Sequence, residues 1–259
     1  MNNPKFTIIL PTLKRPELAA QSIASVLKQN YSDWQLYVVV DDNVTDYTTV
    51  KKTYAEEARI TFFQNPENIG KNKSLNKALY HLKENGFDGY IVYLDDDDWL
   101  SPKCLSDFAE AIKNNPNQNW FVSQRVSTST KEPLTINKTG REVINYRYDM
   151  LLKRTFTGDT THCIKFTITK DIRFPDLIKN AEEWIYFTHV STLQKNFLYL
   201  PVAGTYSEGY APDGLTDNYH NYNERLLNNK LILKEIWRRK IFSPYVLIYI
   251  LGRLVKSFK

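Results

Sequence analysis

The sequence predicts an α/β protein with a mostly parallel sheet, flanking helices and a basic amphipathic helical tail at the C-terminus. In the first 125 residues, short apolar and β-branched runs alternate with stretches of helical period, which is typical of parallel strands joined by crossover helices. Two of the runs end directly in aspartates, and parallel strands carry ligand-binding groups at their carboxyl ends. Basic residues are concentrated in the last 30 positions.

The individual elements follow from the same patterns. The apolar runs predict strands at residues 6–10, 35–40, 60–64, 90–94 and 120–124. Pro16 suits the first position of a helix, and the apolar residues after it fall on one face: Ala19, Ile23, Val26 and Leu27. Weaker patterns predict helices at about residues 47–57 and 71–84. Pro102 is expected to open a fourth helix.

The second half of the chain has a different character. From about residue 114 the alternation gives way to polar, turn-rich sequence, and the compact body is expected to end near Tyr219. A largely helical tail follows, which Pro244 divides into two pieces. The apolar run at residues 245–251 is far shorter than the roughly 20 residues that cross a bilayer. The run at residues 6–10 is too short for the core of a signal peptide.

The positive charge of the chain belongs to its tail. The formal net charge is +5, but residues 230–259 hold eight Lys or Arg against one acid, Glu235, so the rest of the chain is at −2. This predicts an anionic membrane surface as a partner of the tail and argues against a nucleic-acid groove across the body. The alternative is a pair of helices that pack back on the body or on a second subunit. Cys104 and Cys163 are too few for a disulfide framework, which favours a reducing, cytoplasmic compartment.

The strongest chemical signal is four consecutive aspartates that directly follow the strand at residues 90–94. Adjacent like charges repel one another unless cations lie among them. Hard carboxylate oxygens suit Mg²⁺ or Mn²⁺. We therefore favour a metal site at residues 95–98 over the alternative, a solvated acidic turn.

A second pair of carboxylates, Asp41 and Asp42, ends the strand at residues 35–40. Since parallel strands share an edge, this pair is expected near the first cluster, where it could accept hydrogen bonds from a base N–H or from ribose hydroxyls. It could equally form an aspartate-rich turn that caps the next helix.

Three segments together resemble the N-terminal half of family 2 glycosyltransferases. They are FTIILPTLKRPELAAQSIASVLKQNYSDWQLYVVVDDNVTDYT, NPENIGKNKSLNKAL and YIVYLDDDDWLSPKCL, in the family's order and with its usual intervals. The resemblance is strong over residues 6–126. Beyond them it is weaker and closest to the spore-coat polysaccharide type, through residues 161–163, 183–190 and 215–218.

The resemblance implies a GT-A (Rossmann-like) fold and a division of the chain. Residues 1–220 would form the glycosyltransferase domain, with a nucleotide-sugar-binding half at 1–126 and an acceptor-binding half at 127–220. Residues 221–259 would form the tail. The resemblance also implies transfer of a sugar from a nucleotide-diphosphate donor, a UDP-sugar by preference, to a hydroxyl of a glycan or lipid-linked acceptor in bacterial surface polysaccharide synthesis. Such an enzyme would lie on the inner face of the plasma membrane.

The resemblance further implies donor-site residues. Asp42 matches the aspartate that reads uracil, and Pro11 stands at the family's base-contacting position. Asp95 and Asp97 match the acids of the DXD motif, in which Asp97 would hold Mn²⁺ or Mg²⁺ and Asp96 would contact the donor nearby.

Asn76 matches an asparagine of the third crossover, but the arginine that usually precedes it is Leu75 here. Lys71 or Lys73 could supply the missing charge to the donor phosphates. Solvated helix lysines are the favoured interpretation of both residues.

Glu183 matches the catalytic base of an inverting transfer, where the family commonly has aspartate. The alternatives are a catalytic role for its neighbour Glu182 or an acidic helix start without chemistry. His162 is expected to shape the site rather than bind metal. Two other functions are weighed: a non-catalytic glycan-binding or scaffold relative, and a sugar-phosphate nucleotidyltransferase. The second is disfavoured because residues 11–16 lack the glycines of its phosphate loop.

Overall fold

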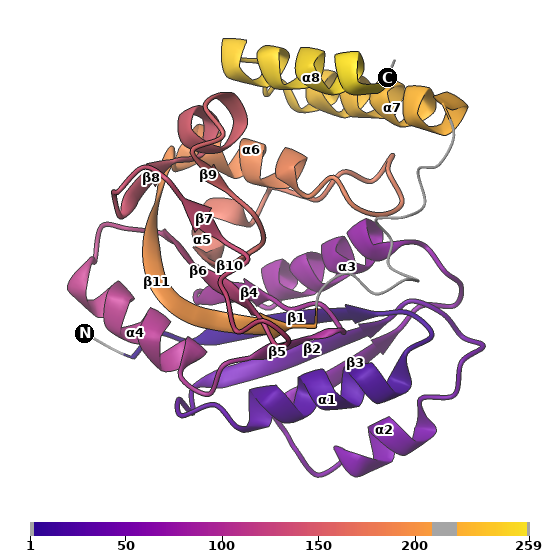
Figure 1. The fold of residues 1–259 in the computed structure, drawn as a ribbon. Helices are drawn as coiled ribbons and strands as arrows, with labels where there is room; N and C mark the ends of the chain where they lie inside the picture. The colour runs from indigo at the N-terminus through magenta and orange to yellow at the C-terminus, as the bar shows by residue number, and fades with distance from the viewer. Residues whose placement is uncertain (1–2, 209–221, 258–259) are drawn as a thin grey trace.

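The structure, a computed structural model, describes residues 3–208 and 222–257. Its centre is a mixed sheet with the strand order β3-β2-β1-β4-β10-β6-β11-β5, and β8 pairs with β11 (Figure 1). Four neighbouring strands are parallel: β1 (Phe6–Thr12), β2 (Trp34–Val40), β3 (Ile60–Gln64) and β4 (Tyr90–Tyr93). Three helices connect them: α1 (Pro16–Leu27), α2 (Thr48–Thr53) and α3 (Lys71–Glu84). The α/β arrangement expected from the sequence is therefore confirmed.

The local sequence patterns predict the ends of two of the helices accurately. α3 spans residues 71–84, as predicted, and ends where Asn85 caps it and Gly86 takes a positive φ of 61°. α4 (Cys104–Asn114) starts two residues after Pro102 and buries Leu105 and Phe108.

The second half of the chain adds strands to the same sheet, which the sequence did not predict. β10 (Thr160–Lys165) lies between β4 and β6 (Trp120–Ser127) and runs antiparallel to both. β10 begins with Thr160, Thr161 and His162, so its polar start hides the strand pattern. The long β11 (Asn196–Ser207) runs parallel to β6 and antiparallel to the short β5 (Asp98–Leu100) and β8 (Val143–Asn145). The remaining elements of this half are β7 (Ile136–Asn137), η1 (Tyr146–Leu152), β9 (Phe156–Thr157), α5 (Phe166–Thr169) and α6 (Trp184–Leu193).

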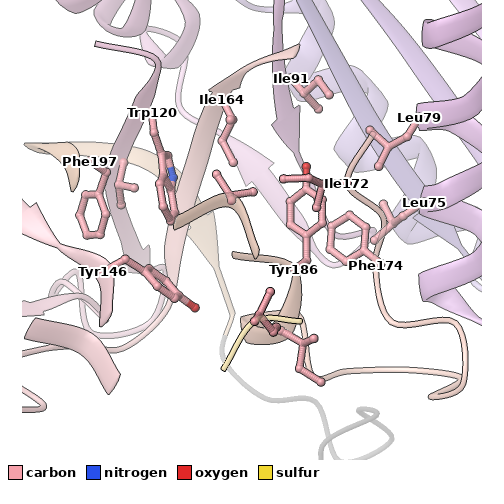
Figure 2. Close-up of a cluster of buried hydrophobic side chains, with 14 of the residues drawn as sticks. Leu75, Leu79, Ile91, Trp120, Tyr146, Ile164, Ile172, Phe174, Tyr186 and Phe197 are labelled. Atoms are coloured by element: carbon pink, nitrogen blue, oxygen red, sulfur yellow. The ribbon is translucent and has the colours of Figure 1, made fainter. Parts of the chain in front are cut away.

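Each face of the sheet has its own apolar core. Alternation along β1 sends Phe6, Ile8 and Leu10 into one core, which α1, α2 and α4 cover, and Ile9 into the other. The second core is rich in aromatic rings: Phe174 stacks on Tyr186 with ring centroids 4.1 Å apart (Figure 2). α3 and α6 cover this face. The sheet is therefore covered by helices on both faces, and its strand ends remain as the edge for a binding site.

The tail forms two helices, α7 (Tyr222–Arg239) and α8 (Pro244–Ser257), which lie over η1 and α6 at the top of Figure 1. Pro244 begins the second helix, as predicted. The expected domain boundary at residue 220, with Tyr219, lies outside the described residues. None of the helices that the structure describes combines the length and the hydropathy needed to cross a bilayer.

The tail helices pack back on the body, which was the alternative considered for them. Ile232, Ile236 and Ile250 belong to the second core. Glu235 is fully buried, and its Oε1 accepts a hydrogen bond of 2.8 Å from the backbone N–H of Leu177. The opposite side of the tail stays exposed and carries large apolar groups, so packing on the body does not use the whole amphipathic surface: Leu233, Trp237, Leu247, Ile248, Leu251 and Val255.

If the tail is part of the core, truncation of its inward side chains should destabilise the whole domain. Ile236→Ala should lower the free energy of unfolding by about 3 kcal/mol, because it removes a fully buried side chain and leaves a cavity. Leu233→Ala, on the same helix at 42% exposure, should cost less than about 1 kcal/mol. Urea unfolding of both variants measures the difference, and equal small losses would mean that the tail is not part of the folded unit.

Candidate functional site

The acidic cluster forms a turn between β4 and β5. β4 ends at Tyr93, residues 95–98 reverse the chain, and Asp98 begins β5. The hydroxyl of Ser22 on α1 lies 2.9 Å from the carbonyl oxygen of Asp96 and 2.7 Å from that of Asp98. Since Ser22 is buried, these two hydrogen bonds fix the acidic turn to α1 and hold the carboxylates of the turn in place.

Three of the four aspartates bring carboxylate oxygens together. One oxygen each of Asp95, Asp97 and Asp98 lies within 4.8 Å of the other two. Such a set of hard oxygens fits Mg²⁺ or Mn²⁺, so the residues present suit the expected ion. Asp98 joins the expected Asp97 in this set and was not singled out from the sequence. Asp96 is placed differently, because its Oδ2 accepts a hydrogen bond of 2.8 Å from the buried hydroxyl of Thr12.

Three cations surround the carboxylates, one each from the start of α1, the start of α3 and the end of β6. Their shortest ion pairs are Arg15 Nη1 to Asp97 Oδ2 at 3.2 Å, Lys71 Nζ to Asp95 Oδ1 at 2.7 Å and Arg125 Nη2 to Asp98 Oδ2 at 2.7 Å. The arginine and lysine side chains of the protein therefore offset the mutual repulsion of the four adjacent aspartates.

The expectation that Lys71 is a solvated helix residue is wrong, because its ammonium lies between two carboxylates. Lys73 is exposed, as expected. Arg15 and Arg125 were not predicted as site residues. For Arg125 a signal existed: it is the one charged residue of the predominantly buried strand β6, and such residues usually need a partner.

The surroundings shift the pKa values of the carboxyl groups apart. Loss of hydration opposes the ionisation of Asp95, but Lys71 and Arg125 outweigh it and lower its pKa to about 2. Burial raises the pKa of Asp96 to about 6 and that of Asp98 to about 7, and their cationic neighbours compensate only in part. Without a divalent ion the cluster therefore carries less than its full negative charge near neutral pH. A bound cation would favour the fully ionised form.

Glu183 lies at this cluster. Its Oε1 is 3.0 Å from Lys71 Nζ, so Lys71 bridges Glu183 and Asp95. Glu183 precedes the first residue of α6, and its side chain is 32% exposed. The preceding Ala181 and Glu182 both have a positive φ of 61°, a conformation that is costly for residues other than glycine. This strained backbone lets the side chains of Glu182 and Glu183 point in different directions.

Glu182 is turned away from the cluster and toward the tail. Its carboxylate is buried, and Oε1 accepts hydrogen bonds from Asn228 Nδ2 at 2.8 Å and Arg253 Nη2 at 2.5 Å. Its Oε2 accepts one from Trp184 Nε1 at 2.5 Å. Of the two glutamates considered as catalytic base, only Glu183 has a contact with the acidic site among the described residues.

The two aspartates after β2 have different tasks. Asp41 accepts hydrogen bonds from Asn65 Nδ2 and from the backbone N–H groups of Ile69 and Gly70 at 2.8–3.0 Å, so it holds the loop that leads into α3. Gly70 has a φ of 96°, and a Cβ there would lie 2.3 Å from the carbonyl oxygen of Lys179. By holding this loop, Asp41 positions Lys71, the residue after Gly70. No sequence pattern indicated this role of Asp41.

Asp42 has the turn-capping role that was one of the two interpretations considered for it. Its Oδ1 accepts hydrogen bonds from the backbone N–H groups of Val44 and Thr45 at 2.9 and 2.7 Å, which is the turn-capping role. Burial works against its ionisation, but these N–H groups hold the pKa of Asp42 below its ordinary value. Its Oδ2 is buried and accepts no hydrogen bond of ordinary geometry from the described residues.

The other predicted site residues lie in ordered parts of the fold. Pro11 is buried in β1 opposite Val39. The amide of Asn76 exchanges two hydrogen bonds with the backbone of Phe174, at 2.7 and 3.0 Å, which joins α3 to the loop before α6. Within the described residues, Asn76 forms no hydrogen bond with the acidic cluster.

His162 is a buried core residue. Its Nδ1 accepts a hydrogen bond of 3.0 Å from Trp120 Nε1, its ring stacks on Phe187, and burial lowers its pKa to about 3. A neutral ring with both nitrogens in hydrogen bonds suits the expected shaping role. The motif expected at residues 215–218 lies outside the described residues.

Comparison of the sequence with known proteins finds one matching family model. The model described as Glycosyl transferase family 2 matches residues 7–171. UDP-Glc:alpha-D-GlcNAc-diphosphoundecaprenol beta-1,3-glucosyltransferase WfgD of Escherichia coli is 28% identical over 207 residues, which cover 76% of this chain and 72% of WfgD. Poly(ribitol-phosphate) beta-N-acetylglucosaminyltransferase TarS of Staphylococcus aureus is 24% identical over 187 residues, 70% of this chain. The match spans only 31% of the length of TarS.

Solved structures confirm the GT-A fold expected from the resemblance. S. aureus TarS 1-349 in complex with UDP-GlcNAc has a TM-score of 0.72 at 18% identity, with 93% of this chain and 71% of that chain covered. The mannosyltransferase PcManGT from Pyrobaculum calidifontis, in complex with GDP-Man and Mn²⁺, has a TM-score of 0.58 at 14% identity, with 99% and 76% covered.

Since Asp98 is buried and paired with Arg125, the stability losses caused by removing the two partners should not be additive. Arg125→Gln should lower the free energy of unfolding by about 3 kcal/mol, because it leaves a buried carboxyl without its cation. The double variant Arg125→Gln/Asp98→Asn should lose clearly less than the sum of the single variants.

Urea unfolding in the presence of EDTA measures this coupling. The control cycle uses Lys83 and Asp171, an exposed pair 2.7 Å apart, for which the coupling should stay below about 1 kcal/mol. Additive losses at Arg125 and Asp98 would contradict the assigned interaction.

Proposed function

The chain belongs to glycosyl transferase family 2, and we propose that it is a metal-dependent, inverting enzyme that transfers a sugar from a UDP-sugar to a hydroxyl of a glycan or lipid-linked acceptor. The observation that carries this proposal is the bridge of Lys71 between Asp95 and Glu183. It joins an acid of the candidate metal site to the candidate base through one ammonium group. A donor diphosphate and an acceptor hydroxyl would meet at that point.

The donor nucleotide would bind at the carboxyl ends of β1 and β2. The Oδ2 of Asp42 would accept a hydrogen bond from a base N–H, and Pro11 would contact the base from β1. Two relatives support a UDP-sugar: WfgD is named for UDP-Glc, and TarS was solved with UDP-GlcNAc. The amide of Asn76 is already hydrogen-bonded to the backbone of Phe174, so Asn76 would act on the donor only indirectly.

The diphosphate would lie at the acidic turn. Asp97 would hold Mn²⁺ or Mg²⁺ together with Asp95 and Asp98, and Asp96 would shape the donor site from the side of Thr12. A bound divalent ion supplies positive charge that offsets the charge developing on the leaving diphosphate. Arg15 would add a second cation on the exposed side of the cluster.

Glu183 would act as the base. In the structure Lys71 pairs with its carboxylate, and a donor phosphate would compete for the same ammonium. Once released, the Glu183 carboxylate takes the proton of the acceptor hydroxyl, whose oxygen forms a bond to the anomeric carbon. The bond from that carbon to the diphosphate oxygen breaks, and the diphosphate leaves with the electron pair. Attack from the face opposite the leaving group inverts the anomeric configuration.

The tail would bring the enzyme to its acceptor. Its exposed side combines Trp237, Leu247 and Leu251 with a local excess of cations, which suits the surface of an anionic membrane. The name of WfgD describes an acceptor on diphosphoundecaprenol, a lipid carrier. A cytoplasmic enzyme on the inner face of the plasma membrane, in bacterial surface polysaccharide synthesis, is the setting that we infer from these observations.

Asp97→Asn should abolish sugar transfer and weaken metal-dependent donor binding, because an amide gives no negative charge to a hard divalent ion. The measurement is the release of UDP from UDP-sugars with Mn²⁺ or Mg²⁺ and after addition of EDTA. Asp107→Asn, on α4 and outside the acidic turn, is the matched control and should remain active. Full turnover of the wild type with EDTA present would refute metal dependence.

Glu183→Gln should leave donor affinity nearly unchanged and lower kcat by about 100-fold or more, the effect expected when a positioned base is lost. Glu110→Gln, an exposed site on α4, should behave as the wild type. Glu182→Gln should mainly lower stability, since its partners are Asn228 and Arg253. Normal kcat in Glu183→Gln, or a product with retained anomeric configuration, would overturn the proposed mechanism.

A further inference from the structure

A separate cavity lies between the body and the tail. It has a volume of about 570 Å³, opens to solvent and is lined mainly by residues of η1, α7 and α8. Leu151 and Leu152 of η1 and Ile248 and Tyr249 of α8 supply apolar walls. Its size is that of a pocket for a small molecule or for part of a larger one.

The charges in this cavity are unbalanced. Arg154, Arg225 and Arg253 all line it, and Arg253 pairs with Glu182. Arg154 and Arg225 form no ion pair with any residue in the described ranges, and the buried Nε of Arg225 has no hydrogen-bond acceptor there. Arg154 is exposed and lies 5.8 Å from the centre of the Tyr249 ring, and Arg225 is half-buried. Two guanidinium groups without a carboxylate partner at one cavity favour an anionic ligand.

An apolar strip leads away from the cavity along α8. Ile248 belongs to the cavity wall and is itself half exposed, and Leu251 and Val255 follow on the same side of the helix at 60% exposure each. Gly252, also in the wall, leaves open space, because a Cβ there would meet nothing within 4 Å. A ligand with an anionic group and a long aliphatic chain matches both features.

The cavity is also connected to the proposed reaction centre. Asn228 and Arg253 from its wall hold the carboxylate of Glu182, and the next residue is Glu183, the proposed base. A ligand anchored by the arginines would therefore bind beside the segment that positions the base.

We propose that this cavity binds the phosphate groups of the acceptor, in which a phosphate or diphosphate joins the growing glycan to a long aliphatic chain. This inference rests on the proposed function for the presence of an acceptor, but the site and its ligand chemistry come from the cavity itself. The arginines pair with the phosphate oxygens, and the chain lies along the apolar strip of α8.

Isothermal titration of the full-length chain with farnesyl diphosphate, below its micelle concentration, tests the proposal. Saturable binding is expected, and inorganic pyrophosphate and farnesol should each bind at least about tenfold more weakly, because each offers only half of the contacts. Equal binding of pyrophosphate would reduce the site to an anion site, and equal binding of farnesol would reduce it to an apolar surface. Either result would overturn the proposal, as would the absence of farnesyl diphosphate binding.

Two variants locate the binding. Arg225→Gln removes one guanidinium, and Gly252→Leu adds a side chain to the cavity wall at a position where a Cβ meets nothing within 4 Å, so each should weaken farnesyl diphosphate binding about tenfold. Lys234→Gln, an equal loss of charge at an exposed position of the same helix, should change it less than twofold. Unchanged binding in both cavity variants would refute the site.

Release of UDP from UDP-GlcNAc by the same variants separates this inference from the proposed function. Neither Arg225 nor Gly252 touches the acidic turn in the structure, so donor hydrolysis should stay at the wild-type rate. A chain that hydrolyses no UDP-sugar, yet binds farnesyl diphosphate in this cavity, would refute the proposed donor chemistry and leave the cavity assignment standing.

Discussion

Four adjacent carboxylates at the end of a buried strand are the constraint on which this molecule depends. Their mutual repulsion has to be met by cations, and the fold brings these from three distant segments. Arg15, Lys71 and Arg125 come from the start of α1, from α3 and from β6, so the acidic turn is stable only when these three segments of the first half are assembled around it. The same arrangement leaves room for exchange, because a divalent ion and a donor diphosphate can replace these internal pairs.

Hydrogen bonds at the start of α3 connect the acidic turn to the segment before α6. Asp41 holds the loop before Gly70, and Asn72 donates to the carbonyl oxygens of Pro175, Ile178 and Ala181 at 2.9–3.0 Å. The segment that carries Glu183 is thus fastened to the helix that carries Lys71. Its strained backbone directs one glutamate to the acidic turn and the other to the tail. The distance between the acidic turn and Glu183 is therefore set by the packing of α3.

Local patterns were sufficient for the first half of the fold. The strand at residues 60–64 and the helix at residues 71–84 have the predicted bounds, because apolar periodicity and a stop at Asn85 are properties of neighbouring residues. The acidic turn was predictable for the same reason. The position of β10 between β4 and β6 was not, since its polar start gives no strand signal and its partners are distant in sequence. Lys71, Arg125 and the buried Glu235 likewise acquire their roles only through tertiary contacts.

The central claim is that the acidic turn exchanges its own cations for a divalent ion and a donor diphosphate. A crystal structure with UDP and Mn²⁺, with data collected at the manganese edge, tests it most directly. The account predicts one anomalous peak within about 2.2 Å of an Asp97 oxygen, close to Asp95 and Asp98, and a Lys71 ammonium that has moved from Glu183 to the diphosphate. UDP bound with no manganese at the turn, and with the three ion pairs intact, would contradict it.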